Sequence, residues 1–418
     1  MEKKQRTDII LNALGVVVAG LGGLGMFFLV GAHYGAPVLG IFNKVFAVYL
    51  VAAQISAFGL PVSVLRRLAP LRGDAPACRN ALRGALRAAA PAIVGVSGAL
   101  YLAAPLLGDL GLGAETAVGL RWAAVALPAF SCTKILLAGL NALSRLRAYA
   151  LCNALRYVLL CCGVLLHMAF DLAPRYLPAT MLFAEGTLLV ILVVFLRDVL
   201  FGPAARELGN EAAAHRAFGL RAFGGNLVQD LTGRVDVICL GLLASDMDVG
   251  IYSMAALLAE AASQLPAVLR TVYNPKTMVL LAERDDAALA ACIRRVRNWV
   301  WLGMGCAGIV AVALYPYAIP LVTGRPEFTQ GTAAFALLML GVAVGAGWTP
   351  FGNLPAGAGF PGTQSMIFLA AFLLNLCGNL LLVPFFGLIG AAAGNAAAQA
   401  LTALLLHRFA RKTLGLIV

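Results

Sequence analysis

Residues 178–196 read PATMLFAEGTLLVILVVFL, and this stretch determines the class of protein. It contains one ionisable side chain, Glu185, and basic residues flank it at Arg175 and Arg197. An α-helix rises 1.5 Å per residue, so about 20 apolar residues cross the ~30 Å hydrocarbon core of a bilayer. The stretch therefore predicts a transmembrane helix.

The same pattern recurs along the whole chain. Apolar runs bounded by charge, Gly or Pro predict twelve spans, near residues 10–31, 43–65, 88–108, 118–143, 149–170, 178–196, 219–244, 250–272, 298–319, 330–350, 364–385 and 387–408. The 418 residues are 61% hydrophobic and only 12% charged, whereas a soluble domain is nearer half apolar and a quarter charged. We predict an all-α, polytopic membrane protein and exclude an ordinary soluble enzyme.

The distribution of Lys and Arg predicts the orientation of these spans. If the N-terminus is cytoplasmic, 24 of the 31 basic residues fall in inner segments. Four lie in the predicted segments on the outer side of the membrane, namely Lys44, Arg121, Arg175 and Arg325. Under the positive-inside rule this bias predicts cytoplasmic N- and C-termini in a bacterial cytoplasmic membrane. It also explains the net charge of +12 without a nucleic-acid partner.

The middle of the chain suggests two lobes. A polar inner segment near 198–218 falls at half the length, so we predict a six-helix lobe over 1–197, a linker over 198–218 and a second six-helix lobe over 219–418. The sequence Gly40-Ile41-Phe42 opens one span and Gly250-Ile251-Tyr252 opens another, 210 residues later. Such an echo is typical of a transporter built from parallel repeats.

Nothing in the sequence indicates a cofactor or metal. The nine cysteines form no CxxC pair, and the four histidines have no partner at metal-ligand spacing. Residues 357–362 fit GxGxxG but follow a predicted membrane helix rather than a strand, so we expect no dinucleotide site. The predicted outer loops are short and leave no domain for chemistry outside the membrane. We therefore predict that the protein is not an enzyme.

The predicted span 219–244 has the densest polar content. It holds Asn226, Gln229, Asp230, Thr232, Arg234 and Asp236. At 100° per residue these side chains occupy one side of a helix and the aliphatic ones the other. Ionisable groups at such depth usually face a bundle interior or a wet cavity. Alternatively Asp230 and Arg234, at i and i+4, neutralise each other, which leaves Asp236, Gln229 and Asn226 unexplained.

Other ionisable residues lie deep in predicted spans. At 1.5 Å per residue Lys134 and Glu260 are each about 15 Å from a helix end, and Glu185 is about 11 Å in. Arg156 lies at similar depth, with snorkelling to the inner headgroups as the alternative. Lys134 and Glu260 could also form a structural pair. Arg270 lies near the inner end of its span, either at a cavity mouth or simply at the membrane interface, which we favour.

These residues give two sets of candidates. The substrate-binding candidates are Lys134, Arg156, Arg234, Asn226, Gln229 and Arg270, and the ion-coupling candidates are Asp230, Asp236, Glu185 and Glu260. The predicted spans contain three basic residues and four carboxylates, so they carry one more negative than positive charge if all are ionised. The count does not by itself predict an anion-binding cavity, because buried carboxylates can instead be protonated and serve proton or sodium coupling.

Motifs in the second half resemble a known family. They are Arg234-Val235-Asp236, then Leu240-Gly241, then Val249-Gly250-Ile251-Tyr252-Ser253 with Ala255. Tyr34-Gly35 and Gly40-Ile41-Phe42 repeat the style early in the chain. Near the end, Pro384 followed by Gly387, Gly390, Ala391 and Ala392 is similar to the family's corner between helices eleven and twelve. In these features and in layout the chain is similar to the Wzx-type O-antigen flippases. They form the polysaccharide transporter branch of the multidrug/oligosaccharidyl-lipid/polysaccharide (MOP) flippase superfamily.

The resemblance implies a MATE-like fold of two six-helix lobes that open alternately to either side. It implies movement of an undecaprenyl-diphosphate-linked oligosaccharide, with Lys134, Arg156 and Arg234 holding the diphosphate and sugar while Asp236 matches an acidic family position. Because no nucleotide motif is present, we expect a proton or sodium gradient to drive transport. Membrane lipid and polysaccharide polymerase or assembly proteins are the expected partners of a monomer.

Two rival functions remain. The acid excess leaves open a multidrug or cation antiporter of the same superfamily, in which the carboxylates rather than the cations would be indispensable. An oligosaccharide polymerase or ligase would ordinarily need a sizeable outer loop with catalytic residues, and the short outer loops are evidence against it.

Overall fold

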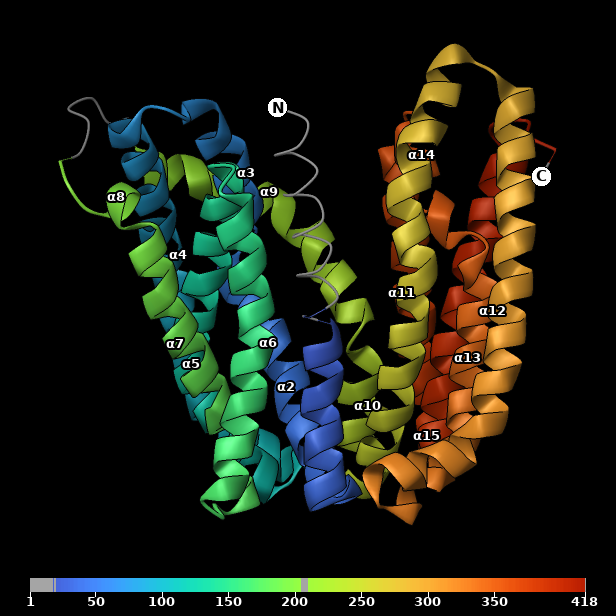
Figure 1. The fold of residues 1–418 in the computed structure, drawn as a ribbon, viewed down its shortest axis with the longest axis horizontal. Coiled ribbons are helices and arrows are strands. Elements are labelled where there is room, and N and C mark those ends of the chain that lie inside the picture. The colour runs from blue at the N-terminus through green and yellow to red at the C-terminus, as the bar shows by residue number, and fades with distance from the viewer. Residues whose placement is uncertain (1–17, 19, 204–209, 418) are drawn as a thin grey trace. The chain divides into compact units, whose positions relative to one another are not determined.

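The computed structural model describes residue 18 and residues 20–203 and 210–417, apart from the side chains of residues 222 and 224–230. Every regular element in these ranges is a helix (Figure 1), which confirms the all-α class. By contacts the chain divides into two compact units. Unit 1 comprises Met1–Val30 and Ile41–Asp230, and unit 2 comprises Gly31–Gly40 and Leu231–Val418.

Unit 1 is a helical bundle centred on α5. A helix over Gly20–Tyr34 belongs to unit 1 as far as Val30. The further elements of unit 1 are α2 (Ala36–Ala57, whose first five residues belong to unit 2), α3 (Leu60–Leu68), η1 (Ala69–Leu71), α4 (Ala75–Leu107), the π-helix η2 (Gly108–Leu112), α5 (Ala114–Ala142), α6 (Leu146–Ala169), η3 (Pro174–Tyr176), α7 (Ala179–Phe195), α8 (Arg197–Leu200) and α9 (Glu211–Thr232, assigned to unit 1 as far as Asp230). Helix α5 packs against α3, α4 and α7. Leu82, Leu140 and Leu192 are fully buried in the core that these contacts form.

Unit 2 is organised around α13 and α15. Its elements are α10 (Val235–Leu243), α11 (Asp246–Glu283), α12 (Asp286–Thr323), η4 (Pro326–Gly331), α13 (Thr332–Ala346), η5 (Thr349–Phe351), α14 (Leu354–Gly357) and α15 (Pro361–Lys412). Ser245 and Asp248 form a capping box that starts α11. Asp285 accepts from the backbone N–H of Ala288 and starts α12.

The helices differ from the predicted spans at three places. The predicted helix over 219–244 is wrong as a single element, because Gly233 and Arg234 lie in a turn between α9 and α10. The predicted span 43–65 breaks at Phe58 and Gly59, both in the left-handed region with φ of 49° and 66°. Conversely, the last two predicted spans form one element, α15, kinked at Gly387.

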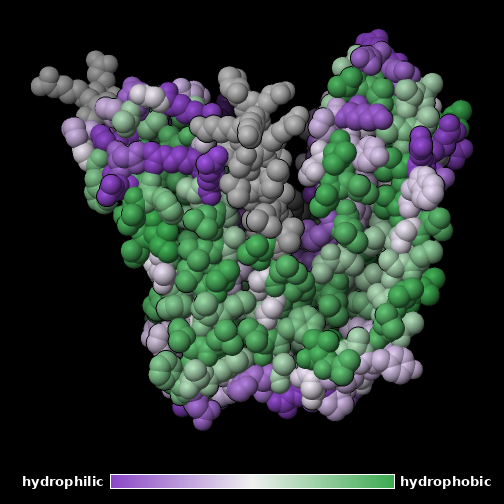
Figure 2. Space-filling model, viewed as in Figure 1, coloured by the Kyte–Doolittle hydropathy of each residue, from purple (hydrophilic) through white to green (hydrophobic). Residues whose placement is uncertain are grey.

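The side faces of the helices are apolar, as a bilayer requires. Eight helices in the described part of the chain are long and apolar enough to cross a membrane. Large side chains such as Leu102, Leu321 and Phe385 are 79%, 86% and 82% exposed. In each unit the visible side is mainly hydrophobic and hydrophilic residues gather at the ends (Figure 2). Exposed apolar surface of this extent identifies a polytopic membrane protein, and the count of twelve spans stays a prediction.

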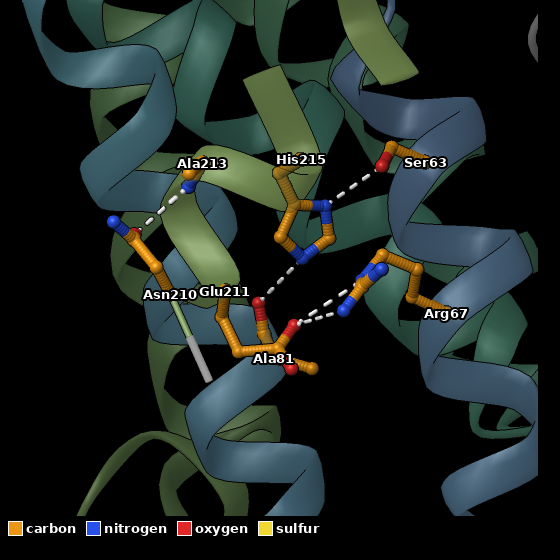
Figure 3. Close-up of polar contacts among 7 residues, drawn as sticks. All are labelled: Ser63, Arg67, Ala81, Asn210, Glu211, Ala213 and His215. Atoms are coloured by element: carbon orange, nitrogen blue, oxygen red, sulfur yellow. Dashed lines mark hydrogen bonds and ion pairs between the residues drawn. The ribbon is translucent and has the colours of Figure 1, made fainter. Parts of the chain in front are cut away.

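The boundary between the two units falls after Asp230, so the start of α9 lies in unit 1. The predicted lobes over 1–197 and 219–418 and the linker over 198–218 stay predictions. His215 is fully buried there. Its Nδ1 lies 2.8 Å from Ser63 Oγ on α3, and its Nε2 lies 3.0 Å from the carbonyl oxygen of Ala81 on α4 (Figure 3). A carbonyl only accepts, so Nε2 carries the proton and neutral Nδ1 accepts from Ser63.

An ion pair lies beside this histidine. Arg67 Nη2 on α3 lies 2.7 Å from Glu211 Oε2 on α9 (Figure 3). Burial lowers the pKa of His215 below its ordinary value, and the positive charge of Arg67 lowers it further. The first turns of α9 are therefore fastened to α3 and α4 by a neutral histidine and a partly exposed ion pair.

Candidate functional site

Three helices of unit 1 line a cavity of about 310 Å³. The lining residues are Pro61, Val62 and Leu65 from α3; Lys134, Leu137, Ala138 and Asn141 from α5; and Tyr149, Asn153 and Arg156 from α6. Two of these side chains are cationic and none is acidic. A volume of this size falls in the range of small-molecule sites.

Helical periodicity explains why these residues share the cavity. On α5, Asn141 lies seven residues after Lys134, and on α6 Tyr149 and Asn153 precede Arg156 by seven and three residues. Residues at such spacing lie on one face of a helix. The sequence interpretation missed Asn141, Tyr149 and Asn153, although spacing from the two predicted cations was a signal that could have found them.

The break between α2 and α3 directs α3 toward the cavity. Phe58 and Gly59 end α2 with left-handed φ angles, and Pro61 near the start of α3 favours a new helix. Pro61 and Leu65 then face the cavity one turn apart, while Ser63 and Arg67, one turn apart on another face, contact α9. A single short helix therefore separates the cavity from the buried histidine.

The two cations lie beside one aromatic ring. Lys134 Nζ donates to Gln54 Oε1 at 2.7 Å and lies 5.5 Å from the ring centroid of Phe130. The guanidinium carbon of Arg156 is 4.8 Å from the same centroid. Cation–π attraction favours both positions, so the ring helps to hold two like charges close together.

Arg156 also has a carboxylate partner. Its Nε lies 2.8 Å from Glu185 Oε1 on α7, and its Nη2 donates to Thr133 Oγ1 at 2.9 Å. Thr133 Oγ1 is in turn 2.7 Å from Glu185 Oε2. The side chains of Arg156 and Glu185 are only 12% and 3% exposed. Arg156 therefore does not snorkel to the headgroups; it is positioned by a buried counter-ion.

A second, smaller cavity lies behind Arg156. Its volume is about 40 Å³, and Arg156, Glu185 and Tyr49 contribute to its lining. The hydroxyl of Tyr49 is buried and has no hydrogen-bond partner among the described residues. Arg156 thus contributes to two cavities, with Glu185 on the small one and Lys134 on the large one.

Asp236 belongs to a separate polar network in unit 2. It is 5% exposed at the start of α10, and its Oδ2 accepts from the Tyr252 hydroxyl and, at 3.1 Å, from Asn395 Nδ2. Asn395 Oδ1 accepts from Gln399 at 2.8 Å. One buried carboxylate therefore connects α10, α11 and α15.

The other predicted site residues lie elsewhere. Arg234 is half-buried at the break before α10, whereas Glu260 and Arg270 are exposed on α11. The side chains of Asn226, Gln229 and Asp230 are outside the described residues. Of the predicted cations the structure brings together Lys134 and Arg156, and of the predicted carboxylates it adds Glu185 to them.

The apolar helical surface and an open cavity lined by two cations are features expected of a membrane transporter. The chain belongs to the family of polysaccharide biosynthesis proteins, because that family's model matches residues 6–276. None of the curated protein sequences compared with the chain matches it.

Solved structures share the fold over nearly the whole chain. The lipid II flippase MurJ, in an inward closed conformation, is 13% identical and has a TM-score of 0.79; the match covers 95% of this chain and 86% of the MurJ chain. A multidrug resistance MATE family transporter of the MOP superfamily, in an inward-facing conformation, is 13% identical with a TM-score of 0.71, covering 98% of each chain. A eukaryotic MATE transporter is 13% identical with a TM-score of 0.65, covering 97% and 95%.

The comparisons establish the family and the fold of the chain. At 13% identity the structural likeness establishes the fold alone, while the family match covers most of the chain. The chain is therefore a member of the polysaccharide biosynthesis protein family with the fold of the MurJ and MATE structures. This confirms the predicted fold class and family.

Proposed function

We propose that the protein moves an undecaprenyl-diphosphate-linked oligosaccharide across the cytoplasmic membrane by alternating access, with the 310 Å³ cavity of unit 1 receiving the diphosphate. The observation that carries this proposal is the pair Lys134 and Arg156, which line one cavity whose described lining residues include no carboxylate. Ammonium and guanidinium groups are the side chains that bind phosphate oxygens best.

The remaining lining suits the rest of such a substrate. Asn141, Asn153 and Tyr149 offer hydrogen-bond donors and acceptors for sugar hydroxyls. The polyprenyl tail is as apolar as the lipid around it, so it stays in the bilayer while the polar head is carried. Membership of the polysaccharide biosynthesis family supports a glycan substrate.

We propose an ion gradient as the driving force and Asp236 as the ion-binding carboxylate. The carboxylate is buried, its hydrogen-bond donors among the described residues are Tyr252, Asn395 and the backbone N–H of Val237, and Arg234 interacts with it electrostatically. A buried acid whose hydrogen bonds come from neutral donors is suited to exchange a proton or a monovalent cation. No further cofactor is proposed. The transporter acts as a monomer and hands its substrate to polymerase or assembly proteins.

The rival function is a multidrug or cation antiporter. The observation that favours it is the same buried Asp236, since an antiporter needs a carboxylate that binds the cationic substrate and the coupling ion in turn. The two functions make opposite demands. A flippase needs Lys134 and Arg156 for its substrate, whereas a cation antiporter tolerates their loss and fails without its carboxylate.

Complementation of a flippase-deficient strain tests the proposal. We expect wild type to restore surface glycan, and Lys134→Ala and Arg156→Ala each to lower it at least about tenfold, because one charge-assisted hydrogen bond is worth roughly 1.5–3 kcal/mol. Arg121→Ala is the matched control, since Arg121 stacks on Tyr101 away from the cavity. Equal membrane abundance is verified for every variant.

The opposite pattern identifies the rival. If well-expressed wild type restores no glycan in strains that supply several glycans, while it confers drug efflux that Asp236→Asn abolishes, the protein is the antiporter. Rescue that Lys134→Ala and Arg156→Ala leave intact would show that the cavity cations do not hold the substrate.

A further inference from the structure

The glycines of the sequence echo, Gly40 and Gly250, meet in unit 2. A Cβ atom added to Gly40 would lie 1.9 Å from the carbonyl oxygen of Asp246, and one added to Gly250 would lie 1.8 Å from the carbonyl oxygen of Ala36. Both obstacles are backbone atoms, which no change of rotamer removes. Only glycine allows α2 and α11 to approach so closely at this point.

The contact is reciprocal under the repeat. Ala36 and Gly40 are one turn apart at the start of α2, and Asp246 and Gly250 are one turn apart at the start of α11. Each glycine contacts the carbonyl that lies four residues before the other, and the offset between the two pairs is 210 residues. The two equivalent helices of the repeat therefore cross at equivalent residues.

Arg325 and Glu327 hold the same segment through hydrogen bonds to its backbone, and we call this pair the polar bracket. Arg325 donates from Nε to the carbonyl oxygen of Ala32 at 3.1 Å and from Nη2 to that of His33 at 2.6 Å. Glu327 Oε1 accepts from the backbone N–H of Ala36 at 2.9 Å, at the first residue of α2. A carboxylate at a helix N-terminus is favourable, so the bracket also stabilises the start of α2.

These contacts are individually weak, so they can break during a conformational change. Approaches between a glycine Cα and a carbonyl oxygen are individually weak, and the bracket consists of a few hydrogen bonds to backbone atoms near the surface. Beyond Gly40, helix α2 continues into unit 1. Release of its first turn would therefore let α2 move with unit 1 without unpacking the core of unit 2.

We propose that the Gly40–Gly250 crossing and the Arg325–Glu327 bracket form a latch, which is closed in one state of the transport cycle and open in the other. The proposal rests on the alternating access proposed above. It assigns a mechanical role to an echo that substrate binding does not explain. A Cβ at Gly40 or Gly250 would need about 1.4 or 1.5 Å of extra separation, respectively, to reach the ~3.3 Å at which a carbon contacts an oxygen.

Cysteine labelling tests the latch independently of the substrate. Ala36, which is fully buried at the crossing, is replaced as Ala36→Cys, and its reaction with a membrane-impermeant maleimide is followed on the purified full chain by peptide mass spectrometry. Reading the peptide of residue 36 separates this site from the nine native cysteines. Gly40→Ala or Gly250→Ala is then added, with Gly303→Ala on α12 as control because a Cβ there meets nothing within 4 Å.

We expect Gly40→Ala and Gly250→Ala to label residue 36 about tenfold faster than the Gly303→Ala control, as a tenfold larger open population would do. Glycan transport should fall in parallel. Labelling as slow as in the control would overturn the latch, and so would fast labelling of Ala36→Cys alone that no added substitution changes. A functional latch in a protein that rescues no glycan would refute only the proposed substrate.

A second pair of variants applies if the glycine variants do not accumulate. Arg325→Gln and Glu327→Gln weaken the bracket without adding an atom to the crossing. Each should speed labelling at residue 36 in a protein that still elutes as a single species. Unchanged labelling in both would also overturn the proposal.

Discussion

At the scale of single residues, the central feature is a cation held by a buried acid. Arg156 is 2.8 Å from Glu185, and both share Thr133. Desolvating such a pair offsets much of its attraction, so its net contribution to stability is modest, but removing one partner leaves an uncompensated buried charge. The pair therefore serves chiefly to hold the guanidinium at the cavity wall.

Glu185→Gln tests this reading. We expect the free energy of unfolding to fall by about 3 kcal/mol, because Arg156 keeps its charge in a site that is only 12% exposed. Thermal unfolding in detergent measures the loss. The double variant Arg156→Met with Glu185→Met should recover stability yet still fail to restore surface glycan. A Glu185→Gln protein as stable as wild type would show that the pair does not position Arg156.

At the scale of elements, α9 is fastened to α3 and α4 through a histidine that folding keeps neutral. His215 is fully buried, and the charged groups facing it are Arg67 on α3 and Glu211 on α9. Protonation would bring a second cation beside Arg67 and would end the acceptance of a hydrogen bond from Ser63. The docking of α9 should therefore depend on pH.

The sign of that dependence follows from linkage. Because the pKa of His215 is lower in the folded protein, the unfolded chain binds more protons between that value and the ordinary pKa of about 6.5. The stabilisation is complete above about pH 6.5 and is lost as pH falls toward the folded pKa, by at most about 1.4 kcal/mol per pH unit. Wild type should thus lose melting temperature on acidification faster than His215→Gln, measured from pH 7.5 to 5.5.

If the melting temperatures of wild type and His215→Gln fall by the same amount between pH 7.5 and 5.5, this account is wrong. Asp171→Asn, which alters an exposed acid in the turn after α6, serves as the control and should follow wild type. If the melting temperature of wild type instead rises relative to that of His215→Gln as the pH falls, the sign is reversed and the folded protein favours the charged ring.

At the scale of the whole molecule, apolar content and charge bias decide how the chain lies in a membrane. Helices such as α12 expose aliphatic and aromatic side chains that only lipid can cover. The excess of basic residues in alternate predicted connections then predicts the orientation of the helices. The number of crossings and the sides of the connections can be measured directly.

Reporter fusions test the predicted topology. Alkaline phosphatase fused after Asp171, in the turn between α6 and η3, should be active because the enzyme works only outside the cytoplasm. Fusion after Arg284, between α11 and α12, should leave it inactive and a fluorescent protein bright. We expect differences of about tenfold or more, since flanking charges bias orientation strongly. Reversed activities at both positions would contradict cytoplasmic termini.

How much of the site could be predicted is visible in particular residues. Lys134, Arg156 and Glu185 stood out because a charge inside an apolar run is costly. Asn141, Asn153 and Tyr149 did not, because polar uncharged residues are common in membrane helices and only their spacing from the cations marks them. The pairing of Arg156 with Glu185 depends on contacts between α6 and α7, which no spacing along the chain encodes.

The sequence by itself determined the helical class, the membrane setting, the family resemblance and the repeat that contains Gly40 and Gly250. These properties depend on local composition and period, which a linear chain carries in full. Only the tertiary structure decided that Lys134 and Arg156 share a cavity, that Asp236 joins a network with Tyr252 and Asn395, and that the two glycines meet. The physical reason is that burial, ion pairing and close backbone approach arise between helices far apart in sequence, so they exist only after the helices have packed.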